Sequence, residues 1–289
     1  MKQVYEVAGL TRQALHKHKL QYNKKVNETA KFFERAQQIR KEHPGIGCRK
    51  LALLMRCHGW GRDKLERQLL NDGFGVCYPP NFIRTTDRRK DYYYPNHIEG
   101  IEVNNICQVV QSDITYYRVN EKFYYINFLL DVYSKRIVGY SLNKSLHAAG
   151  CIRGLKKMLR LRSKRQLKGL IHHTDRGSQY VATAYRKLLD DYDIKPSMCL
   201  MSWENAYVER INRTIKSEYL DHWKIRDYAT LAKRLKQAVE HYNHKRQHAS
   251  LNGQSPVNFE RNVQNKPKKQ RPKFRIYKQL EVNPHKKCG

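Results

Sequence analysis

The sequence predicts a mixed α/β fold, in which helices cover a five-stranded sheet, preceded by a small all-helical region. Two residue patterns along the chain support this prediction. The first 75 or so residues space their apolar side chains at helical intervals, whereas from residue 106 segments rich in β-branched and aromatic residues alternate with helical ones. An apolar fraction of 40% in 289 residues is enough to build a core, which argues against a largely disordered chain.

The charge of the chain is strongly positive. It carries 57 Lys and Arg against 26 Asp and Glu, a formal net charge of +31, whereas solubility alone usually needs about 2–8 in a small domain. So large an excess favours a polyanion as partner, nucleic acid first. An anionic membrane is the rival, but no basic amphipathic helix with Trp or Phe on its apolar face stands out. With no spanning apolar run and no secretory signal, we expect a cytoplasmic protein.

Residues 1–77 are expected to form a helical N-terminal region. A short helix should run from Thr11 to about Lys19, and a second should cover 27–42. Within about 47–73, two helices separated by a Gly-Trp-Gly turn are what a helix-turn-helix requires, with an ordinary αα-hairpin as the alternative. The net charge favours DNA contact. The second helix would present four candidates for phosphates and base edges: Arg62, Lys64, Arg67 and Gln68.

After a linker over 78–104, the chain changes to alternating strands and helices. The first three strand segments are separated by breaks short enough for hairpins, so they should be antiparallel. The order βββαβαβα predicts a mixed sheet covered by helices, in a core over 105–225. A helical extension over 226–265 and a Lys/Arg-rich basic tail over 266–289 follow. The expected strands are 106–113, 122–134, 135–143, 169–175 and 195–200, and the expected helices are 147–162, 178–191, 205–219 and 228–244.

Three carboxylates stand at element ends in this acid-poor core. Asp113 ends the first strand, Asp175 ends the fourth, and Glu209 lies in the first turns of a helix. If those two strands are neighbours, the two aspartates converge where functional groups of open α/β sheets gather, and a helix packed across that edge can deliver Glu209. Taken singly, each also has an ordinary interpretation as a turn residue, a helix cap or a surface acid.

Three carboxylates at one point repel one another unless cations lie between them. Magnesium binds through a few carboxylates plus phosphate oxygens, and two such ions about 3.5–4 Å apart clamp the attacking and leaving oxygens of a phosphoryl displacement. Lys216 follows Glu209 by two helical turns and so lies on the same helix face, and Arg213 lies on that side too. These two cations are candidates for binding the phosphates of a DNA backbone. The seven cysteines, irregularly spaced and without a CxxC pair, favour neither a disulfide framework nor a zinc site.

At these residues the chain resembles the DDE transposases with an integrase catalytic core, and among them the OrfB-type transposases of bacterial insertion sequences. The matching pieces are QSDITYY, LLDVYSKRIVGYSL, HHTDRGSQY, ENAYVERINRTIKSEYL and HYNHKRQHASLNGQSP. They run from about 106 to 260, over half of the chain, and their combination is highly specific although no single piece is. HPGIGCRKLALLMRCHGWGRDKLERQLL also resembles the helix-turn-helix-like segment upstream of the core in these proteins.

The resemblance implies a ribonuclease-H-like fold, two Mg²⁺ ions for which Mn²⁺ can substitute, and cleavage and joining of DNA at transposon ends. Carried over residue by residue, the acidic triad falls on Asp113, Asp175 and Glu209, and a DNA-contacting lysine falls on Lys216. The implied partners are the terminal repeats of the element, target DNA and a second copy of the chain in a dimer or higher oligomer. An upstream-frame DNA-binding protein or fusion, and a place in the bacterial nucleoid, are implied as well.

Two more arginines, Arg176 and Arg246, lie within the matching motifs and are further DNA-contact candidates. The chain also departs from the family pattern. It has 33 residues between Asp175 and Glu209, where the family usually has 35, and the loss falls in the loop 199–203. Glu204 replaces the usual Asp before Asn-Ala and would serve the helix N-terminus. Two alternatives remain open, a nuclease of the same fold that hydrolyses but never joins strands, and a non-catalytic DNA-binding protein.

Overall fold

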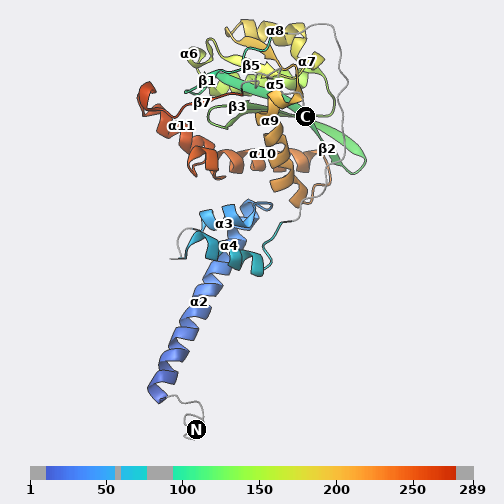
Figure 1. Cartoon of the computed structure of the whole chain (residues 1–289). Coiled ribbons are helices and arrows are strands. Elements are labelled where there is room, and N and C mark those ends of the chain that lie inside the picture. Colours follow the sequence, from blue (N-terminus) through green and yellow to red (C-terminus); the bar gives the residue numbers. More distant parts are fainter. Residues whose placement is uncertain (1–10, 56–59, 77–93, 278–289) are drawn as a thin grey trace, which may run out of the picture. The chain divides into compact units, whose positions relative to one another are not determined.

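The computed structural model describes residues 11–55, 60–76 and 94–277. The chain divides into two compact units, residues 1–77 and 78–289. As far as they are described, the first is all-helical and the second holds the strands together with further helices (Figure 1).

The first unit begins with a long helix, α2, which spans Arg12–Glu42 without a break. The prediction of two separate helices here is therefore wrong. Residues 20–26 contain neither Gly nor Pro, so nothing in that stretch interrupts the backbone hydrogen bonds. The start is as expected, because Thr11 caps the helix: its hydroxyl oxygen accepts a hydrogen bond from the backbone nitrogen of Ala14 at 3.1 Å.

Two shorter helices follow within 47–73, α3 at Cys48–Leu54 and α4 at Arg62–Asn71. They pack on the second half of α2, and the first unit has a hydrophobic core of its own. Its buried side chains include Phe32, Ala36, Ile39, Leu51, Leu65 and Leu69. The expected pair of helices is thus present, and contact with DNA stays a prediction. Residues 56–59, on which part of the expected turn falls, lie outside the described residues.

A mixed sheet of five strands forms the middle of the second unit. Its strand order is β4-β3-β2-β5-β6. β2, β3 and β4 are antiparallel neighbours, and β5 and β6 run parallel to β2. The antiparallel arrangement of the first three strands is confirmed, as is the ribonuclease-H-like fold. The strands span Val109–Val119 (β2), Lys122–Asp131 (β3), Ile137–Asn143 (β4), Ile171–Thr174 (β5) and Lys195–Met198 (β6).

Helices cover both faces of the sheet (Figure 1). Successive residues of β3 point to opposite faces, so Leu129 packs with α5 and α8 while Phe128 and Leu130 pack with α9 and α10. Burial on both faces explains why β3 is almost continuously apolar rather than alternating. The helices are α5 Ala148–Leu161, α6 Lys164–Leu167, α7 Ser178–Val181, α8 Thr183–Asp190, α9 Ala206–Glu218, α10 Tyr228–His244 and α11 Pro256–Gln264.

The expected linker and basic tail are partly wrong. β1 (Glu102–Val103) pairs antiparallel with β7 (Phe274–Arg275), so the described parts of both segments form a second, two-stranded sheet. Val103 and Ile276 are fully buried in the core beside the main sheet. The apolar residues of these strands alternate with polar ones over only three positions, at 101–103 and 274–276, which is too short a stretch to predict a strand. Residues 78–93 and 278–289 lie outside the described residues.

The helical extension is also part of the core and not an appendage. α10 contributes Leu231, Leu235 and Tyr242 to the core on one sheet face. α11 is attached by a buried ion cluster, in which Glu260 accepts hydrogen bonds from the guanidinium groups of Arg136 and Arg162. A buried carboxylate needs such partners, because an unpaired charge in the interior is costly.

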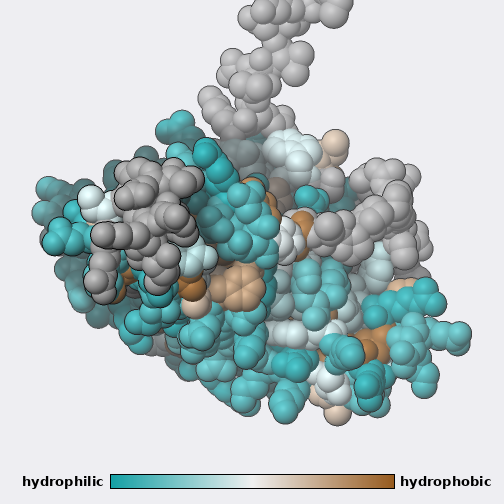
Figure 2. All heavy atoms as spheres, turned by 90° about the horizontal axis from the view of Figure 1, so that it is seen from below, coloured by the Kyte–Doolittle hydropathy of each residue, from teal (hydrophilic) through white to brown (hydrophobic). Residues whose placement is uncertain are grey.

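Most of the surface shown in Figure 2 is hydrophilic, and its hydrophobic residues form small, separate spots. Among the described helices, none combines the length and apolar composition needed to cross a membrane. The four described cysteines, Cys48, Cys107, Cys151 and Cys199, are buried free thiols.

Candidate functional site

The two predicted aspartates lie at matching positions on neighbouring strands. β2 and β5 are parallel, and Ser112 is the register partner of Thr174 at the end of their pairing. The next residues are Asp113, which lies within β2 and not at its end as predicted, and Asp175, which directly follows the last residue of β5. Because parallel strands carry equivalent residues to the same end of the sheet, this register brings the two carboxylates to one edge, as the sequence predicted.

Helix α9 is joined to β2 by side-chain amides. The side chain of Gln111 donates to the carbonyl of Glu204 at 2.9 Å and accepts from the backbone nitrogen of Val208 at 3.2 Å. Asn205 donates to the carbonyl of Ser112 at 3.1 Å. Gln111 and Asn205 are buried, so losing a partner would leave a polar group unsatisfied. The first turn of α9, which carries Glu209, is therefore fixed relative to the strand that carries Asp113.

Further along α9, two more side chains reach the same strand. Asn212 donates from its side-chain nitrogen to Oδ2 of Asp113 at 2.6 Å. The Lys216 ammonium donates to the hydroxyl of Thr115 at 2.9 Å and lies 5.4 Å from the ring centre of Tyr116. The sequence analysis did not single out Asn212. Its position three residues after Glu209, on a neighbouring part of the same helix face, was the available signal.

The pKa values of the three acids are raised, and the causes connect them. Burial raises the pKa of Asp113 to about 8, and the negative charges of Asp175 and Glu209 add to the rise. Burial also raises the pKa of Asp175. The pKa of Glu209 is raised by burial and by Asp175, against the opposing charge of Arg213. The charge of Asp175 thus makes Asp113 and Glu209 harder to ionise, and the charge of Glu209 adds to the effect on Asp113, which is the electrostatic signature of a site that favours a cation.

The donor set at this edge consists of oxygen atoms. The neighbouring thiols of Cys151 and Cys199 have their pKa values raised by burial to about 12, so they stay protonated and are poor metal ligands. Carboxylate oxygens suit Mg²⁺ or Mn²⁺ better than Zn²⁺. Within the described residues, no three His, Cys, Asp or Glu side chains already stand close enough to hold an ion.

Buried polar residues form hydrogen bonds with side chains of β2 and β5. The hydroxyl of Ser112 donates to Oδ1 of Asn127 at 2.9 Å, and the hydroxyl of Tyr180 donates to the same oxygen at 3.2 Å. On β5, His172 pairs with the hydroxyl of Tyr185 at 2.7 Å. Burial lowers the pKa of His172 to about 4, so the ring is neutral and acts as a structural partner at neutral pH.

The loop 199–203 lies at the end of β6, beside the aspartates. The carboxylate of Glu204 accepts hydrogen bonds from the backbone nitrogens of Leu200 and Met201, so it holds the loop and the start of the short helical turn before α9. This agrees with a structural role at a helix start. Arg176, a DNA-contact candidate, donates to the carbonyl of Cys199 at 3.1 Å. The loop also presents Leu200, Met201 and Trp203 as exposed apolar side chains.

One DNA-contact candidate has a different environment from that predicted. Arg246 is only 6% exposed, and its guanidinium forms two hydrogen bonds with the carboxylate of Glu218, at 2.6 and 2.7 Å. This buried pair links α9 to the end of α10. Its burial contradicts the expectation that Arg246 contacts DNA, and it explains the role of Glu218, which lies on the far side of α9 from Glu209.

The other candidates lie at the surface. Arg213 is exposed on α9. In the first unit, Arg62 forms an exposed ion pair with Asp63 at 2.8 Å, and the ammonium of Lys64 lies 4.4 Å from the ring centre of Trp60. Arg67 is exposed, and Gln68 donates to the side chain of Asp72 at 3.0 Å. The contribution of all these side chains to DNA binding stays a prediction.

Comparison with known proteins gives a consistent family. Two family models described as "Integrase core domain" match residues 106–200 and 193–256. Over 223 residues the chain is 30% identical to the "Transposase for insertion sequence element IS629" of Shigella sonnei, covering 70% of this chain and 74% of that protein. The chain belongs to the insertion-sequence transposases with an integrase core domain.

Two further relatives match about half of this chain. The "Insertion element IS600 uncharacterized 31 kDa protein" of Shigella sonnei is 34% identical over 155 residues, which is 53% of this chain and 56% of that protein. The "Putative transposase for insertion sequence element IS986/IS6110" of Mycobacterium tuberculosis is 29% identical over 157 residues, 52% of this chain and again 56% of that protein. The chain thus spans about half the length of these two relatives.

Among solved structures, the catalytic core domain of the HTLV-2 integrase in complex with magnesium is similar, with 20% identity and a TM-score of 0.43 over 57% of this chain and 99% of that one. A chain of the simian T-cell lymphotropic virus intasome in complex with the PP2A regulatory subunit B56 gamma has 15% identity and a TM-score of 0.48, over 86% and 79% of the two chains.

Proposed function

We propose that this chain is a DNA transposase, a polynucleotidyl transferase that cleaves DNA at the ends of a mobile element and joins it to a target. The observation that carries the proposal is the register of β2 and β5, which brings Asp113 and Asp175 to one sheet edge. Glu209, in the first turn of α9, is near enough for its charge to raise the pKa of Asp113. Membership of the transposase family supports the same reading. In this proposal, Asp113, Asp175 and Glu209 are the catalytic triad.

The three acids would hold the divalent metal, Mg²⁺ or Mn²⁺. Two such ions supply activation of the attacking water or hydroxyl and neutralisation of charge on the leaving oxygen. The protein's own part is to position the carboxylates and to grip the phosphates. Asn212 orients Asp113 through its hydrogen bond to Oδ2. Lys216, held by the hydroxyl of Thr115, and exposed Arg213 supply positive charge on the helix that carries Glu209.

The partners belong to the proposal as well. DNA at the terminal repeats and at the target would bind along the carboxylate edge and on the first unit, through Arg62, Lys64, Arg67 and Gln68. Arg176, beside Asp175, is the remaining candidate there. Because joining brings two element ends together, we propose a homodimer or higher oligomer on DNA, in the bacterial cytoplasm at the nucleoid. The proposed assembly also includes an upstream-frame DNA-binding protein, separate or fused.

A strand-transfer assay tests this proposal. A labelled duplex carrying the element's own end is incubated with Mg²⁺ and either the wild-type chain, Glu209→Gln or the matched control Glu240→Gln, an exposed glutamate on α10. We expect joined product with the wild type and the control, and none with Glu209→Gln. Nicked but unjoined DNA would favour the nuclease instead. Tight, salt-sensitive binding without any product, in Mg²⁺ or Mn²⁺, would favour a non-catalytic DNA-binding protein.

A further inference from the structure

A cavity of about 620 Å³ lies at the opposite end of the sheet from the carboxylates. Its floor includes Val109 and Ile171, the first residues of β2 and β5, whereas Asp113 and Asp175 follow the last paired positions of these strands. Asp113 lies four positions along β2 from Val109, a span of about 13 Å at the usual rise of a β-strand. The cavity is therefore separate from the candidate active site.

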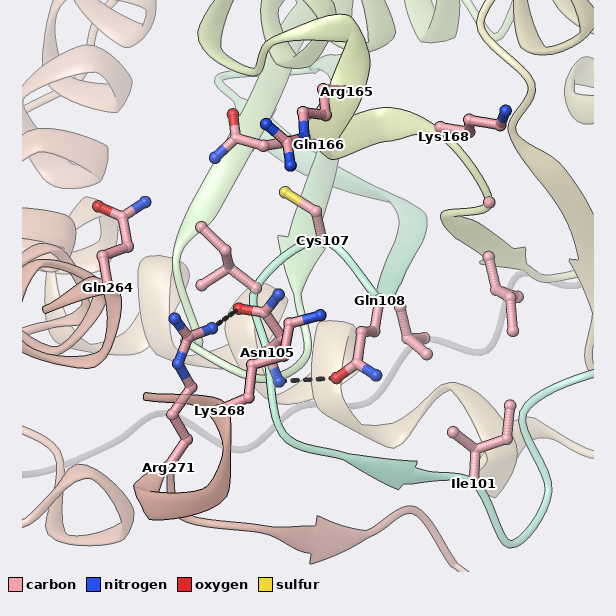
Figure 3. A pocket seen from close by; sticks show the side chains of 14 residues that line it. Ile101, Asn105, Cys107, Gln108, Arg165, Gln166, Lys168, Gln264, Lys268 and Arg271 are labelled. Carbon is pink, nitrogen blue, oxygen red and sulfur yellow. Dashed lines mark hydrogen bonds between the residues drawn. The ribbon is translucent and has the colours of Figure 1, made fainter. Parts of the chain in front are cut away.

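The lining of the cavity is strongly cationic. Arg165 and Lys168 come from α6 and the turn after it, and Lys268 and Arg271 come from the segment after α11, on another wall (Figure 3). The remaining polar side chains are amides, and none of the lining residues is an Asp or Glu. Four positive charges around one hollow repel one another, and a bound anion relieves that repulsion.

The wall that carries Arg271 and the loop beside it are held in place by the fold. Arg271 donates to the carbonyl of Lys266 at 3.0 Å and to the side chain of Asn105 at 2.5 Å. The side chain of Gln108 accepts from the backbone nitrogens of Asn104 and Asn105, at 2.7 Å each, which fixes the loop that forms the floor. The pairing of β7 with β1 anchors the segment that carries Arg271. Little ordering of this frame is needed when an anion binds, which favours affinity.

We propose that this cavity binds the phosphodiester backbone of a DNA segment other than the one at the carboxylates. The proposal rests on the proposed function only in taking DNA as the polyanion. The spread of the charges favours a polymer over a single small phosphate: the cations stand on separate walls, and exposed Lys164, Lys266 and Lys269 continue the positive surface beyond the lining. Successive phosphates along a strand match such a spread, and releasing their counterions favours binding.

The consequence is that one chain would contact DNA at both ends of its central strands. A segment at the carboxylate edge would be the one that reacts. A second segment, held at the cavity without chemistry, would be flanking or target DNA. The contact would be independent of sequence, because phosphate contacts position DNA without reading its bases.

The salt dependence of DNA binding tests this proposal. The variant carries Arg165→Glu, Lys168→Glu and Lys268→Glu, three exposed residues of the lining. The control carries Lys156→Glu, Lys187→Glu and Lys233→Glu, which are exposed, lie outside the lining and change the net charge equally. Affinity for a short duplex of arbitrary sequence is measured by fluorescence anisotropy over a salt series, without divalent metal. Circular dichroism checks folding, and Lys168→Gln with Lys268→Gln serves if the triple variant does not fold.

We expect the slope of log affinity against log salt to fall in magnitude by about 2–3 in the cavity variant and by less than about 1 in the control, since each phosphate contact contributes about 0.9. Equal falls in both would overturn the proposal, because net charge alone would then explain binding. The proposal would also be overturned if the cavity variant kept the wild-type slope but lost an ability of the wild type to bind inorganic pyrophosphate. That result would indicate a site for a small phosphate. If the wild-type chain shows no strand transfer but the salt slopes of the cavity variant and the control still differ, only the catalytic proposal fails.

Discussion

The side-chain nitrogen of Asn212 lies 2.6 Å from Oδ2 of Asp113. This hydrogen bond joins the helix that carries Glu209 to the strand that carries Asp113, and it is charge-assisted when the carboxyl is ionised. The relationship explains how side chains from distant parts of the sequence keep one arrangement.

Removing this bond should weaken the chemistry more than the fold. We expect Asn212→Ala to lower the strand-transfer rate about tenfold or more, since a hydrogen bond to a charged group contributes about 1.5–3 kcal/mol. DNA affinity should change little, because Asn212 carries no charge. The control is Asn258→Ala, an exposed asparagine on α11. Equal rates for the two variants in a single-turnover assay would exclude a positioning role for Asn212.

The pKa of Asp113 predicts a pH dependence of stability in the metal-free protein. Burial raises this pKa from 3.8 to about 8, with Asp175 and Glu209 adding to the rise. The folded chain therefore holds the proton more tightly than the unfolded chain. The contribution of Asp113 to the free energy of unfolding is complete below pH 3.8 and is lost as the pH rises through about 8.

Urea unfolding in the presence of a chelator measures this effect. Relative to Asp113→Asn, the wild-type chain should lose stability steadily between about pH 5 and pH 8. The comparison with Asn cancels the titration of the other buried acids, because both proteins contain them. A difference in the free energy of unfolding that stays constant across this range would contradict the raised pKa.

The buried pair of Arg246 and Glu218 should act on stability and not on DNA binding. Removing one partner leaves the other charge buried and alone, so Arg246→Ala should destabilise the fold by about 3–5 kcal/mol. At a temperature where the variant is folded, the salt slope of DNA binding should match the wild type. A slope reduced by about 1 would instead restore Arg246 as a phosphate contact.

The sequence predicted that Asp113 and Asp175 converge, because chain order and the scarcity of acids pointed to the same edge. It was wrong in placing Asp113 at a strand end, because β2 continues to Val119 through its pairing with β3. It could not predict the pairing of Arg246 with Glu218, since in a chain of this charge a single arginine looks like any other. The burial of Val103 and Ile276 was hidden for a related reason. Each lies in a segment with only a few apolar residues among polar and charged ones, and the pairing of β1 with β7 accompanies their burial in the core.

The central claim is that Asp113, Asp175 and Glu209 form a divalent-metal site. Calorimetric titration of the full chain with Mn²⁺, without DNA, tests it most directly. We predict binding by the wild type and by the control Glu240→Gln, and loss of that binding in Asp113→Asn and Asp175→Asn. Affinity should also rise as the pH increases toward about 8, because the ion displaces a proton from Asp113. Unchanged Mn²⁺ binding in both aspartate variants would contradict the account.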